Sequence, residues 1–541
     1  MLTFEAFGEA ALFFRSPQAG EVEAASFRLA ADPPAYITDV ACSRRTGLVA
    51  FDPALAGPDE AEAAVQKAAE DAKRAPIRPR REVLVRVVLD GQDLAELLEG
   101  AHAGVEEFAD ELTMNAFPVA HLGFAPGFVY LDGLSERFRR PRRASPRTRV
   151  PAGAVAIGGP YLGIYGTAAP GGWNLVGTTH QKLFDEHREP PMELAPGDSV
   201  RFSIAGESDT PPLVEEVAGF SDPPAQGALE VLEADGAAWL EDGGRRCSGI
   251  WAVPHSGAAD PWTHRLANLL VGNQAAAPAI EIPLGRIKLR ALAPLHLATA
   301  GDGLQVSLDG RPMAAGHCFP VAPGQIMEIS ASPDSTYGYV AVAGGFHARR
   351  WFGSASHDRL SGFGPTPLES GQRLPVLPPT APPKDHLLRS RGGHAPVRVV
   401  AGPHLEHFSG EERDLLANAE FRISPSSSRV GVRLDGAGFA QRERRTLEES
   451  EPLALGAIQV PPGGQPIVML ADHPVTGGYP VIATVILADL DRITQPRPGS
   501  VVRFAYVDAE QARSAYRNRL AAQSKLAVGN RPFEELKSTE Y

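Results

Sequence analysis

Short apolar runs separated by turns make up most of the chain, whereas helical patterns are concentrated near its beginning. Residues 58–73 carry alanines at helical spacing after an acidic first turn, which predicts an amphipathic helix. The β-branched run at 83–89 predicts a strand, and residues 93–101 and 105–116 predict two further helices. From His121 onward, short apolar segments alternate with Gly and Pro. This pattern predicts a mainly β protein with an α+β domain at its start.

Composition and charge narrow the class of protein. The chain has 541 residues, 43% hydrophobic and 22% charged, with 55 Gly and 49 Pro, which is typical of a soluble multidomain protein rich in turns. The formal charge of -13 argues against a nucleic-acid or anionic-membrane partner. The three cysteines lie far apart without a CxxC pair, so neither a disulfide framework nor a metal site is expected. An acidic start without a basic region, and the lack of a long apolar run, predict a cytoplasmic protein without a signal peptide or membrane span.

Pro-rich stretches mark the expected boundaries. Residues 207–226 are acidic and Pro-rich, which predicts a linker, and a second stretch at 375–383 is expected to join two lobes. We therefore expect an α+β domain at 1–85, a barrel at 86–206, and a region at 227–541 that contains two β lobes.

A set of short motifs that occurs twice in the same order indicates an internal duplication. The segments VPAG (150–153), GGW (171–173) and PGDSVRF (196–202) are followed in the same order by VPPG (460–463), GGY (477–479) and PGSVVRF (498–504). A shared turn before a strand would explain the last pair alone. All three in order favour two related barrels.

The first candidate for chemistry is a run of arginines. Seven arginines and no acid fall within residues 137–149, where prolines keep the chain extended. Guanidinium groups suit carboxylates and phosphates, so the run is a candidate anion site. A solvated basic loop, a contact with an acidic partner or, more weakly, a nuclear-localisation signal would use the same residues.

Three further constellations have both a structural and a functional interpretation. His121 begins a Gly- and Pro-containing segment and could exchange protons near neutral pH, although a lone histidine is more often structural. Residues 260–272 have the features of a capped helix, with Asp260 as N-cap, Pro261 first and Gly272 at the end, which leaves Arg265 and Asn268 as possible site residues. Polar side chains, among them Gln459, Gln465 and Asp472, flank the Gly477-Gly478-Tyr479 turn, where ordinary turn chemistry is the alternative to a pocket mouth.

No P-loop, HExxH, GxSxG, GxGxxG or biotin-attachment motif is present, so known nucleotide and hydrolase motifs suggest no mechanism. Two groups of segments nevertheless resemble a known family. Residues 121–130, 141–153 and 169–173 look like the B subunit of 5-oxoprolinase, a family that overlaps sporulation-kinase inhibitors and allophanate hydrolase subunit 1. Residues 256–261, 265–273, 342–345, 353–354, 456–462 and 471–480 look like the C subunit of the same enzyme. The chain therefore resembles a fusion of 5-oxoprolinase subunits B and C.

This resemblance implies duplicated cyclophilin-like β-barrels and an ATP-dependent hydrolase that opens 5-oxoproline to glutamate. ATP with Mg²⁺ would be the co-substrate, no biotin would be attached, and the separate A subunit of 5-oxoprolinase would be the partner. A homo-oligomer is also compatible with the sequence. Two positions depart from the family pattern, since Ala355 stands where an arginine is usual and Ser428 where an acid is usual. If these positions touch substrate, another cyclic amide or acid would be preferred.

Combining the residue patterns with the resemblance gives a set of expected site residues. His121 and Asp472 are the expected catalytic residues. The expected substrate- or nucleotide-binding residues are Arg142, Arg143, Arg147, Arg149, Gly171, Gly172, Trp173, Arg265, Asn268, Arg429, Gln459, Gln465, Gly477, Gly478 and Tyr479. Two other functions remain open: a carboxyltransferase module of a biotin-dependent, urea carboxylase-like enzyme, and a non-enzymatic regulator of a histidine kinase.

Overall fold

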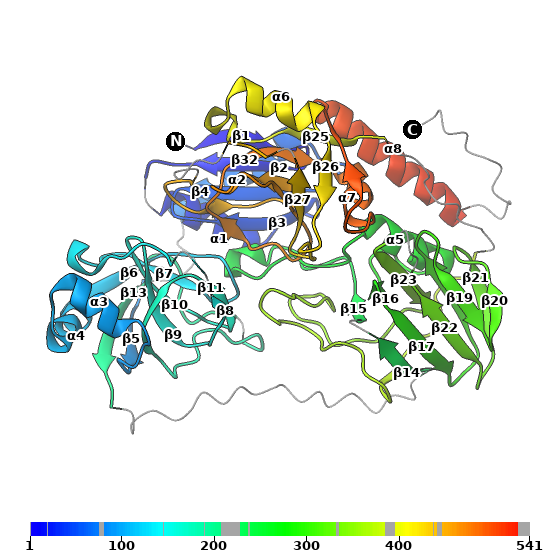
Figure 1. The fold of residues 1–541 in the computed structure, drawn as a ribbon, viewed down its shortest axis with the longest axis horizontal. Helices are drawn as coiled ribbons and strands as arrows, with labels where there is room; N and C mark the ends of the chain where they lie inside the picture. Colours follow the sequence, from blue (N-terminus) through cyan, green and yellow to red (C-terminus); the bar gives the residue numbers. More distant parts are fainter. Residues whose placement is uncertain are drawn as a thin grey trace.

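The fold is described from a computed structural model of the chain. It describes residues 2–18, 20–74, 80–143, 145, 147–188, 190–206, 228–235, 238–331, 335–384, 395–436, 438–440 and 446–528. The linker expected at 207–226 lies outside these residues. Four units follow one another along the chain, and Figure 1 shows the first and last units together above the two middle ones.

The first unit is an antiparallel sheet covered by two helices. Its sheet has the order β1-β2-β4-β3, and α1 packs against α2. The predicted helix at 58–73 is confirmed as α2, which buries Ala61, Val65, Ala68 and Ala69 on one face. The elements are β1 (Thr3–Phe7), β2 (Ala11–Arg15), α1 (Glu21–Ala31), β3 (Ile37–Cys42), β4 (Thr46–Phe51) and α2 (Pro58–Arg74).

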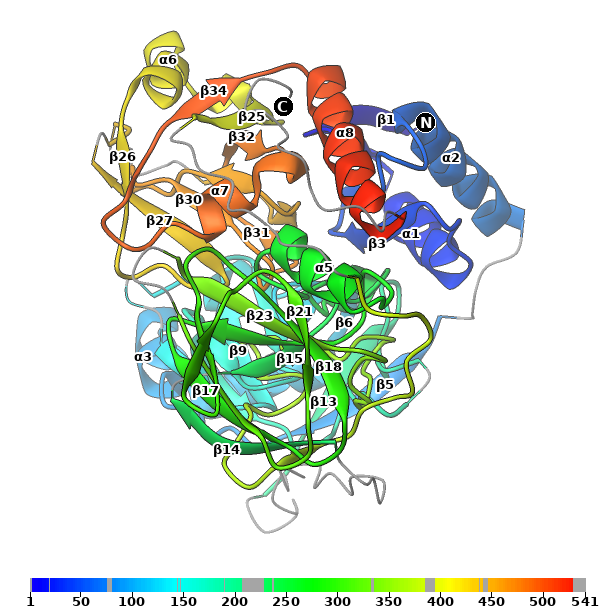
Figure 2. The same cartoon turned by 90° about the vertical axis from the view of Figure 1, so that its right-hand side faces the viewer.

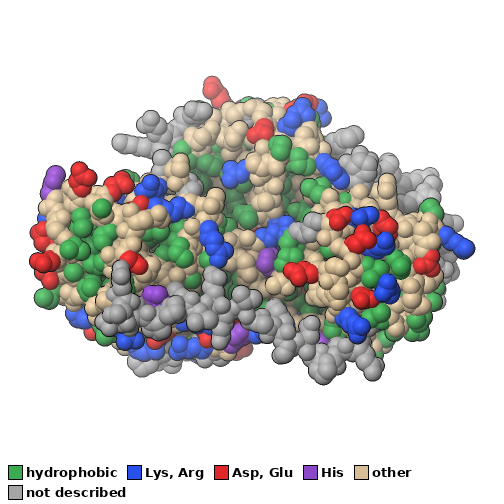
Figure 3. Space-filling model, turned by 60° about the horizontal axis from the view of Figure 1, so that its bottom comes forward, with side chains coloured by type: hydrophobic (Ala, Val, Ile, Leu, Met, Phe, Trp, Pro, Cys, Tyr) green, Lys and Arg blue, Asp and Glu red, His purple; other side chains and the backbone are tan. Residues whose placement is uncertain are grey.

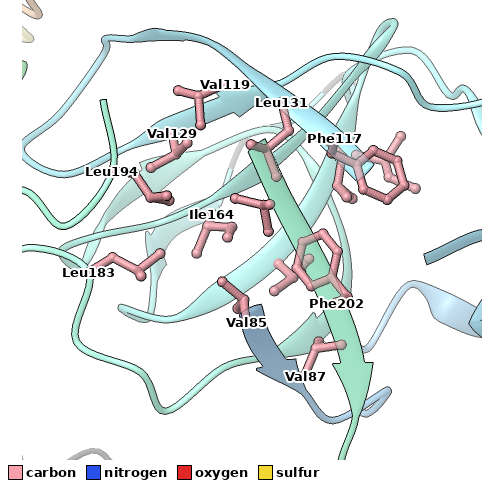
Figure 4. Close-up of a cluster of buried hydrophobic side chains, with 14 of the residues drawn as sticks. Val85, Val87, Phe117, Val119, Val129, Leu131, Ile164, Leu183, Leu194 and Phe202 are labelled. Carbon is pink, nitrogen blue, oxygen red and sulfur yellow. The ribbon is translucent and has the colours of Figure 1, made fainter. Parts of the chain in front are cut away.

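The second unit is a closed barrel. Its seven-stranded sheet has the order β12-β9-β10-β7-β6-β13-β5, and a bridge between Val88 and Thr178 joins the two edges. Figure 4 shows Val85, Phe117, Leu131 and Phe202 from different strands meeting in its interior. The elements are β5 (Glu82–Val87), α3 (Leu94–Ala101), α4 (Val105–Met114), β6 (Ala116–Leu122), β7 (Val129–Leu131), β8 (Arg147–Val150), β9 (Ala154–Gly158), β10 (Tyr161–Ile164), β11 (Ala169–Gly171), β12 (Asn174–Thr178) and β13 (Ser199–Ile204).

The third unit consists of two sheets and one helix. A six-stranded sheet, β20-β19-β22-β17-β14-β24, lies with a five-stranded sheet, β15-β16-β23-β18-β21, and α5 packs on the latter. The elements are β14 (Leu229–Asp235), β15 (Trp239–Glu241), α5 (Pro261–Leu270), β16 (Ala279–Pro283), β17 (Arg286–Ala291), β18 (Leu295–Ala300), β19 (Gln305–Leu308), β20 (Arg311–Met313), β21 (Cys318–Val321), β22 (Ile326–Ser330), β23 (Tyr337–Val342) and β24 (Arg373–Leu374).

The fourth unit is an eight-stranded sheet followed by a long helix. Its order is β33-β26-β27-β30-β29-β32-β25-β34, and Figure 2 shows α8 running beside α5 of the third unit. The elements are β25 (Val397–Ala401), α6 (Gly410–Asn418), β26 (Phe421–Ile423), β27 (Gly431–Gly436), β28 (Glu451–Pro452), β29 (Ala457–Gln459), β30 (Ile467–Met469), β31 (Thr476–Gly477), β32 (Val481–Val485), α7 (Asp491–Thr494), β33 (Val501–Val502), β34 (Phe504–Tyr506) and α8 (Ala509–Val528).

The second and fourth units share one topology. In both, the last strand segment runs parallel to the first strand of the unit, as β13 does with β5 and β34 with β25. The same stretch also pairs antiparallel with the second strand of the unit, β6 or β26. Each barrel carries a small two-stranded sheet, β8 with β11 and β28 with β31, in the same place in the strand order. The expected fold class, mainly β with an α+β start and duplicated barrels, is confirmed.

One part of the predicted duplication is wrong, namely the equivalence of the VPAG and VPPG segments. The GGW and GGY segments both lead from the small sheet into the next barrel strand, β12 or β32, and both PG turns lead into the last strand. The VPAG segment at 150–153 instead precedes β9, whereas the VPPG segment follows β29, the strand equivalent to β9. The two segments therefore occupy different turns, and their similarity reflects the general preference of turns for Pro and Gly.

Hydrophobic clusters join the part of the chain before the linker to the part after it. Phe7 and Phe13 of the first unit share a cluster with Leu453, Met469 and Val481 of the fourth. Trp351 and Phe363 belong to the same cluster as the interior of the second unit, and Cys247 and Ile250 to that of the first unit. The four units thus form one interlocked body.

Candidate active site

A buried arginine is held by acids from two different units. Arg429, in the turn between β26 and β27, is 0% exposed and donates from Nε and Nη2 to the two oxygens of Asp472 at 2.8 and 3.0 Å. Nη1 donates to Glu281, Nη2 donates to the Gly257 carbonyl, and a Glu241 oxygen lies 3.6 Å from Nη2. Burial alone would lower the pKa of Arg429, but the surrounding carboxylates raise it well above its ordinary value. This charged centre (Arg429 with Asp472, Glu281 and Glu241) joins the third and fourth units.

Strand pairing explains why the acids converge. Trp239 lies opposite Glu281 in the β15–β16 pair, and Glu241 lies two residues after Trp239, so all three are on one face of the sheet. Glu281 also lies opposite Tyr339, whose hydroxyl donates to it at 2.8 Å. Within the described residues, both carboxyl oxygens of Glu241 lack a hydrogen-bond partner. Burial raises the pKa of Glu241 well above its ordinary value, which favours the neutral form of this carboxyl group.

A cavity of about 270 Å³ adjoins the charged centre. Helices α5 and α8, the segment around Gly257, and Ala471 beside Asp472 form its walls, which are mainly apolar. Arg265 and Ser256 add polar groups. Arg265 is half-buried, and its Nε has no hydrogen-bond partner among the described residues, nor has the hydroxyl of Ser256. Ser256 also has a φ of 53°, a strained conformation that marks functional sites more often than ordinary loops.

A second polar cluster lies where the two barrels meet. His121 on β6 stacks on Tyr130 with ring centroids 4.0 Å apart and is 2% exposed. Neither ring nitrogen has a hydrogen-bond partner within the described ranges, and burial lowers the pKa of His121 to about 3, so the ring is neutral at pH 7. The Phe124 backbone N–H donates to the hydroxyl of Thr476 at 3.0 Å. The segment 470–479 therefore links the two places, with Asp472 at the charged centre and Thr476 at the His121 cluster.

Arginines of the run at 137–149 form hydrogen bonds and ion pairs within their own barrel. Arg147 donates to both oxygens of Asp93 at 2.8 Å, and Arg143 donates to the same carboxylate at 2.9 Å. These contacts give Arg143 and Arg147 a structural partner in place of a ligand. Arg142 is exposed and lies 5.9 Å from the centre of the Trp173 ring, and Arg149 is also exposed. An anion-binding role stays a prediction for these two.

The remaining expected residues divide between core and turn. Trp173 is buried against Phe128, and Gly171 is needed because a Cβ there would lie 2.1 Å from the Tyr165 hydroxyl. The Gly172 carbonyl accepts from the Arg143 backbone N–H at 2.7 Å. Asn268 is buried and donates to the Ala277 carbonyl at 2.9 Å. These contacts are those of structural residues.

The Gly477-Gly478-Tyr479 turn lies beside the second cluster. Gln459 is buried and donates to the Tyr479 carbonyl at 3.0 Å, so it holds the turn in place. A Cβ on Gly477 would lie 2.7 Å from Gln459, while the Gly478 carbonyl accepts from the Leu447 N–H. Gln465 lies apart on the surface and donates to Asp435.

The two residues that depart from the family pattern, Ala355 and Ser428, lie in different surroundings. Ala355 is 0% exposed, and its backbone N–H donates to the buried carboxylate of Asp242 at 2.8 Å. Ser428 is exposed in a tight turn, where its carbonyl accepts from the Gly431 N–H at 3.2 Å. The turn places Arg429, the next residue, at the charged centre.

The expected site residues include Arg429, Asp472 and Arg265 but not Glu281 and Glu241, the two other acids beside Arg429. Glu281 stands in the apolar run AIEIP and Glu241 follows Trp239-Leu240. An acid at an inward position of an apolar strand is a signal that a buried partner exists, although it does not identify that partner.

In Figure 3, basic side chains gather around the hollow middle of the face between the two lower units.

Within the described ranges, no group of three or more His, Cys, Asp or Glu side chains is arranged to hold a metal ion. Nor does any helix of the described chain have the length and apolar character to span a membrane.

The sequence matches two family descriptions that together span most of the chain. Residues 2–194 match "Carboxyltransferase domain, subdomain C and D", and residues 251–506 match "Carboxyltransferase domain, subdomain A and B". These matches and the duplicated barrels thus define a carboxyltransferase-domain protein.

Particular relatives refine this class. The chain is 32% identical over 300 residues to the C subunit of 5-oxoprolinase from Haemophilus influenzae, covering 52% of this chain and 93% of that protein. It is 52% identical over 114 residues to the B subunit of 5-oxoprolinase from Escherichia coli O157:H7, covering 21% of this chain and 51% of that protein. It is also 28% identical over 311 residues to urea amidolyase of Lachancea kluyveri, covering 52% of this chain and only 17% of that protein.

A crystal structure of the protein TTHA0988 is similar over nearly the whole chain, with a TM-score of 0.81, 33% identity, and coverage of 93% of this chain and 100% of that one. The chain belongs to the family of the 5-oxoprolinase subunits B and C, with the B-like part first and the C-like part second.

Proposed function

We propose that this chain is the component of an ATP-dependent 5-oxoprolinase that activates 5-oxoproline, and that a separate protein similar to the A subunit of that enzyme completes ring opening to glutamate. The observation that carries the proposal is the similarity of successive parts of one chain to the B and C subunits of 5-oxoprolinase. The contacts between the units support it. Segment 470–479 reaches both the charged centre beside the cavity, through Asp472, and the His121 cluster where the two barrels meet, through Thr476.

Opening of the 5-oxoproline ring requires activation of an unreactive amide. In the proposed reaction the lactam oxygen attacks the γ-phosphorus of ATP and ADP leaves. Water then adds to the activated carbon, the ring C–N bond breaks as the nitrogen takes up a proton, and inorganic phosphate leaves, which gives the side-chain carboxylate of glutamate. Arg265 is suited to stabilise negative charge in the cavity, because its half-buried guanidinium has an unpartnered Nε within the described chain. The cavity of about 270 Å³ is large enough for a small cyclic amide.

The two expected catalytic residues receive different roles. His121 keeps its place as a candidate base at the barrel junction because both ring nitrogens lack a hydrogen-bond partner within the described chain, but burial lowers its pKa to about 3, so it would act as a base only if the site raised that pKa toward neutral. Both oxygens of Asp472 accept from Arg429, which makes Asp472 a positioning residue for Arg429 rather than a group that transfers protons.

The test is glutamate release from 5-oxoproline by this chain mixed with its A-type partner protein. We expect release that requires ATP and both proteins. Arg265→Gln should lower the rate, whereas Arg517→Gln, a change of an exposed arginine on α8 paired with Glu510, should leave it unchanged. Absence of ATP-dependent glutamate release from the complete mixture would refute the proposal.

A carboxyltransferase acting with a biotin carrier is the second candidate. The matched family descriptions and the similarity to a urea amidolyase favour it. Since the chain lacks a biotin-attachment motif, the carrier would act in trans. Carboxylation of urea that depends on an added biotinylated carrier, without glutamate release from 5-oxoproline, would establish this function instead.

A further inference from the structure

Three neighbouring side chains beside the charged centre present nitrogen atoms without hydrogen-bond partners. These buried atoms are Nε and Nη2 of Arg359, Nε1 of Trp239 and Nδ1 of His357, and none has a partner among the described residues. The Arg359 guanidinium carbon lies 3.6 Å from the centre of the Trp239 ring, and His357 stacks on the same ring at 5.9 Å. Arg359 and His357 are half-buried, so solvent reaches part of each.

The unpartnered edge of Arg359 has a defined ligand preference. Nε and Nη2 point along the same side of a guanidinium and form a fork that matches the two oxygens of a carboxylate. Among the described residues this edge binds a carboxylate in Arg398 with Asp489, in Arg429 with Asp472 and in Arg201 with Glu82. Arg359 offers the same edge without a partner in the described chain.

The acids nearest to Arg359 are already committed. Both oxygens of Asp472 accept from Arg429, and the oxygens of Glu281 accept from Arg429, Tyr339 and the Ala259 N–H. Arg359 itself contacts Asp472 only through its backbone N–H, at 3.4 Å. An anion from outside the chain would therefore complete the hydrogen bonding of this side chain.

The loop that carries Arg359 is held in place before any ligand arrives. The side chain of Asp358 accepts from the backbone N–H groups of Leu360 and Ser361 at 3.1 and 3.2 Å, and its backbone N–H donates to the Phe363 carbonyl at 2.7 Å. Asp358 is fully buried, while its neighbours on both sides are half-buried. A preorganised loop lowers the entropic cost of binding.

We propose that Arg359, Trp239 and His357 form a subsite that binds the carboxylate of a small molecule. The guanidinium fork takes the two carboxylate oxygens, and the indole fixes the plane of the guanidinium. The subsite deepens the proposed function, because 5-oxoproline carries a carboxylate, and it rests on that function for the identity of the ligand.

The experiment is calorimetric titration of the full chain with 5-oxoproline, with the matched amide 5-oxoprolinamide, with a panel of simple carboxylates (acetate, succinate and glutamate), and with inorganic phosphate. Arg359→Lys keeps the charge but loses the fork, and Arg359→Gln loses both. We expect carboxylate affinity to fall about ten- to a hundredfold in these variants, the loss of one charge-assisted bidentate contact. Arg349→Gln is the matched control, since Arg349 is exposed and lies 5.2 Å from the Trp351 ring.

Each outcome decides a different point. Carboxylate binding that depends on Arg359, with weak binding of the amide, supports the subsite. If 5-oxoproline does not bind but another carboxylate does so through Arg359, the subsite stands and the proposed substrate fails. If 5-oxoproline is converted by the Arg359 variants with unchanged KM and kcat, the subsite fails and the proposed function stands. Arg359-dependent binding of phosphate alone, or no carboxylate binding by the unaltered chain, overturns the subsite.

Discussion

Replacing Arg429 with Met should destabilise the contact between the third and fourth units. The side chain is fully buried and donates to Asp472, Glu281 and the Gly257 carbonyl. Met fills a similar volume but leaves two carboxylates buried without a positive partner. Breaking a buried ion pair in this way costs about 3–5 kcal/mol, because the remaining charge keeps its desolvation penalty.

The expected effect is measurable as a melting shift. For units of this size each kcal/mol lowers the midpoint by about 2–4 °C, so Arg429→Met should lower it by about 6–20 °C at pH 8. Differential scanning calorimetry with buffers between pH 5 and 8 measures the shift. An uncompensated buried carboxylate binds a proton rather than remain charged. The deficit should therefore be largest at pH 8 and shrink as the pH falls.

A matched control replaces an arginine of an exposed ion pair, so that loss of a charge at the surface can be compared with loss of a buried charge. Arg503 pairs with Glu420 on the surface, where the two side chains are 54% and 56% exposed. Arg503→Met should leave the midpoint within about 2 °C, since exposed pairs contribute little. Adding Asp472→Asn and Glu281→Gln to Arg429→Met should recover part of the loss. A midpoint for Arg429→Met equal to that of the control at pH 8 would refute the role given to the charged centre.

Four further substitutions test other parts of the structure. Gly171→Ala should destabilise the first barrel by about 1–3 kcal/mol, because its Cβ would lie 2.1 Å from the Tyr165 hydroxyl, and a melting curve would show this loss. Glu241→Gln should gain stability relative to the unaltered chain as the pH rises from 5 to 8. Because burial raises the pKa of Glu241, the folded chain keeps a proton that the unfolded chain releases above about 4.5. The stability of the unaltered chain therefore falls as the pH rises from there to the folded-state value, and urea unfolding at both pH values checks the sign. Arg147→Ala should lower the melting midpoint by several degrees, whereas exposed Arg142→Ala should not, and loss of ATP-dependent activity in the latter at full stability would establish anion binding there.

Local signals in the sequence were sufficient for several elements. The predicted helix with Asp260 as N-cap and Pro261 at its first position is α5, and the Asp260 side chain accepts from the Trp262 and Thr263 N–H groups. The strand predicted at 83–89 is β5 (Glu82–Val87), and the two following helices are α3 and α4. Each of these elements is specified by residues within one or two turns of one another, which is the range that periodicity and capping report.

The site was only partly predictable because its contacts are long-range. Arg429 is 148 residues from Glu281 in sequence, and Arg147 is 54 residues from Asp93. A run of arginines shows that anions must be near but not whether they are side chains or ligands. For Arg143 and Arg147 the anion is the side chain of Asp93, which precedes α3 and is held by hydrogen bonds with Leu175 of β12 that the sequence does not specify.

The apolar cluster shared by Phe7, Phe13, Leu453 and Val481 has a consequence for synthesis of the chain. The neighbouring pair Arg15 and Glu451 is separated by 436 residues. At roughly 5–20 residues per second, the first sheet emerges about 20–90 s before its partner surface exists. During that interval its apolar face is exposed and prone to aggregation. Expression of residues 1–206 alone should therefore give an insoluble or chaperone-bound product, and simultaneous expression of the remaining part should restore its solubility.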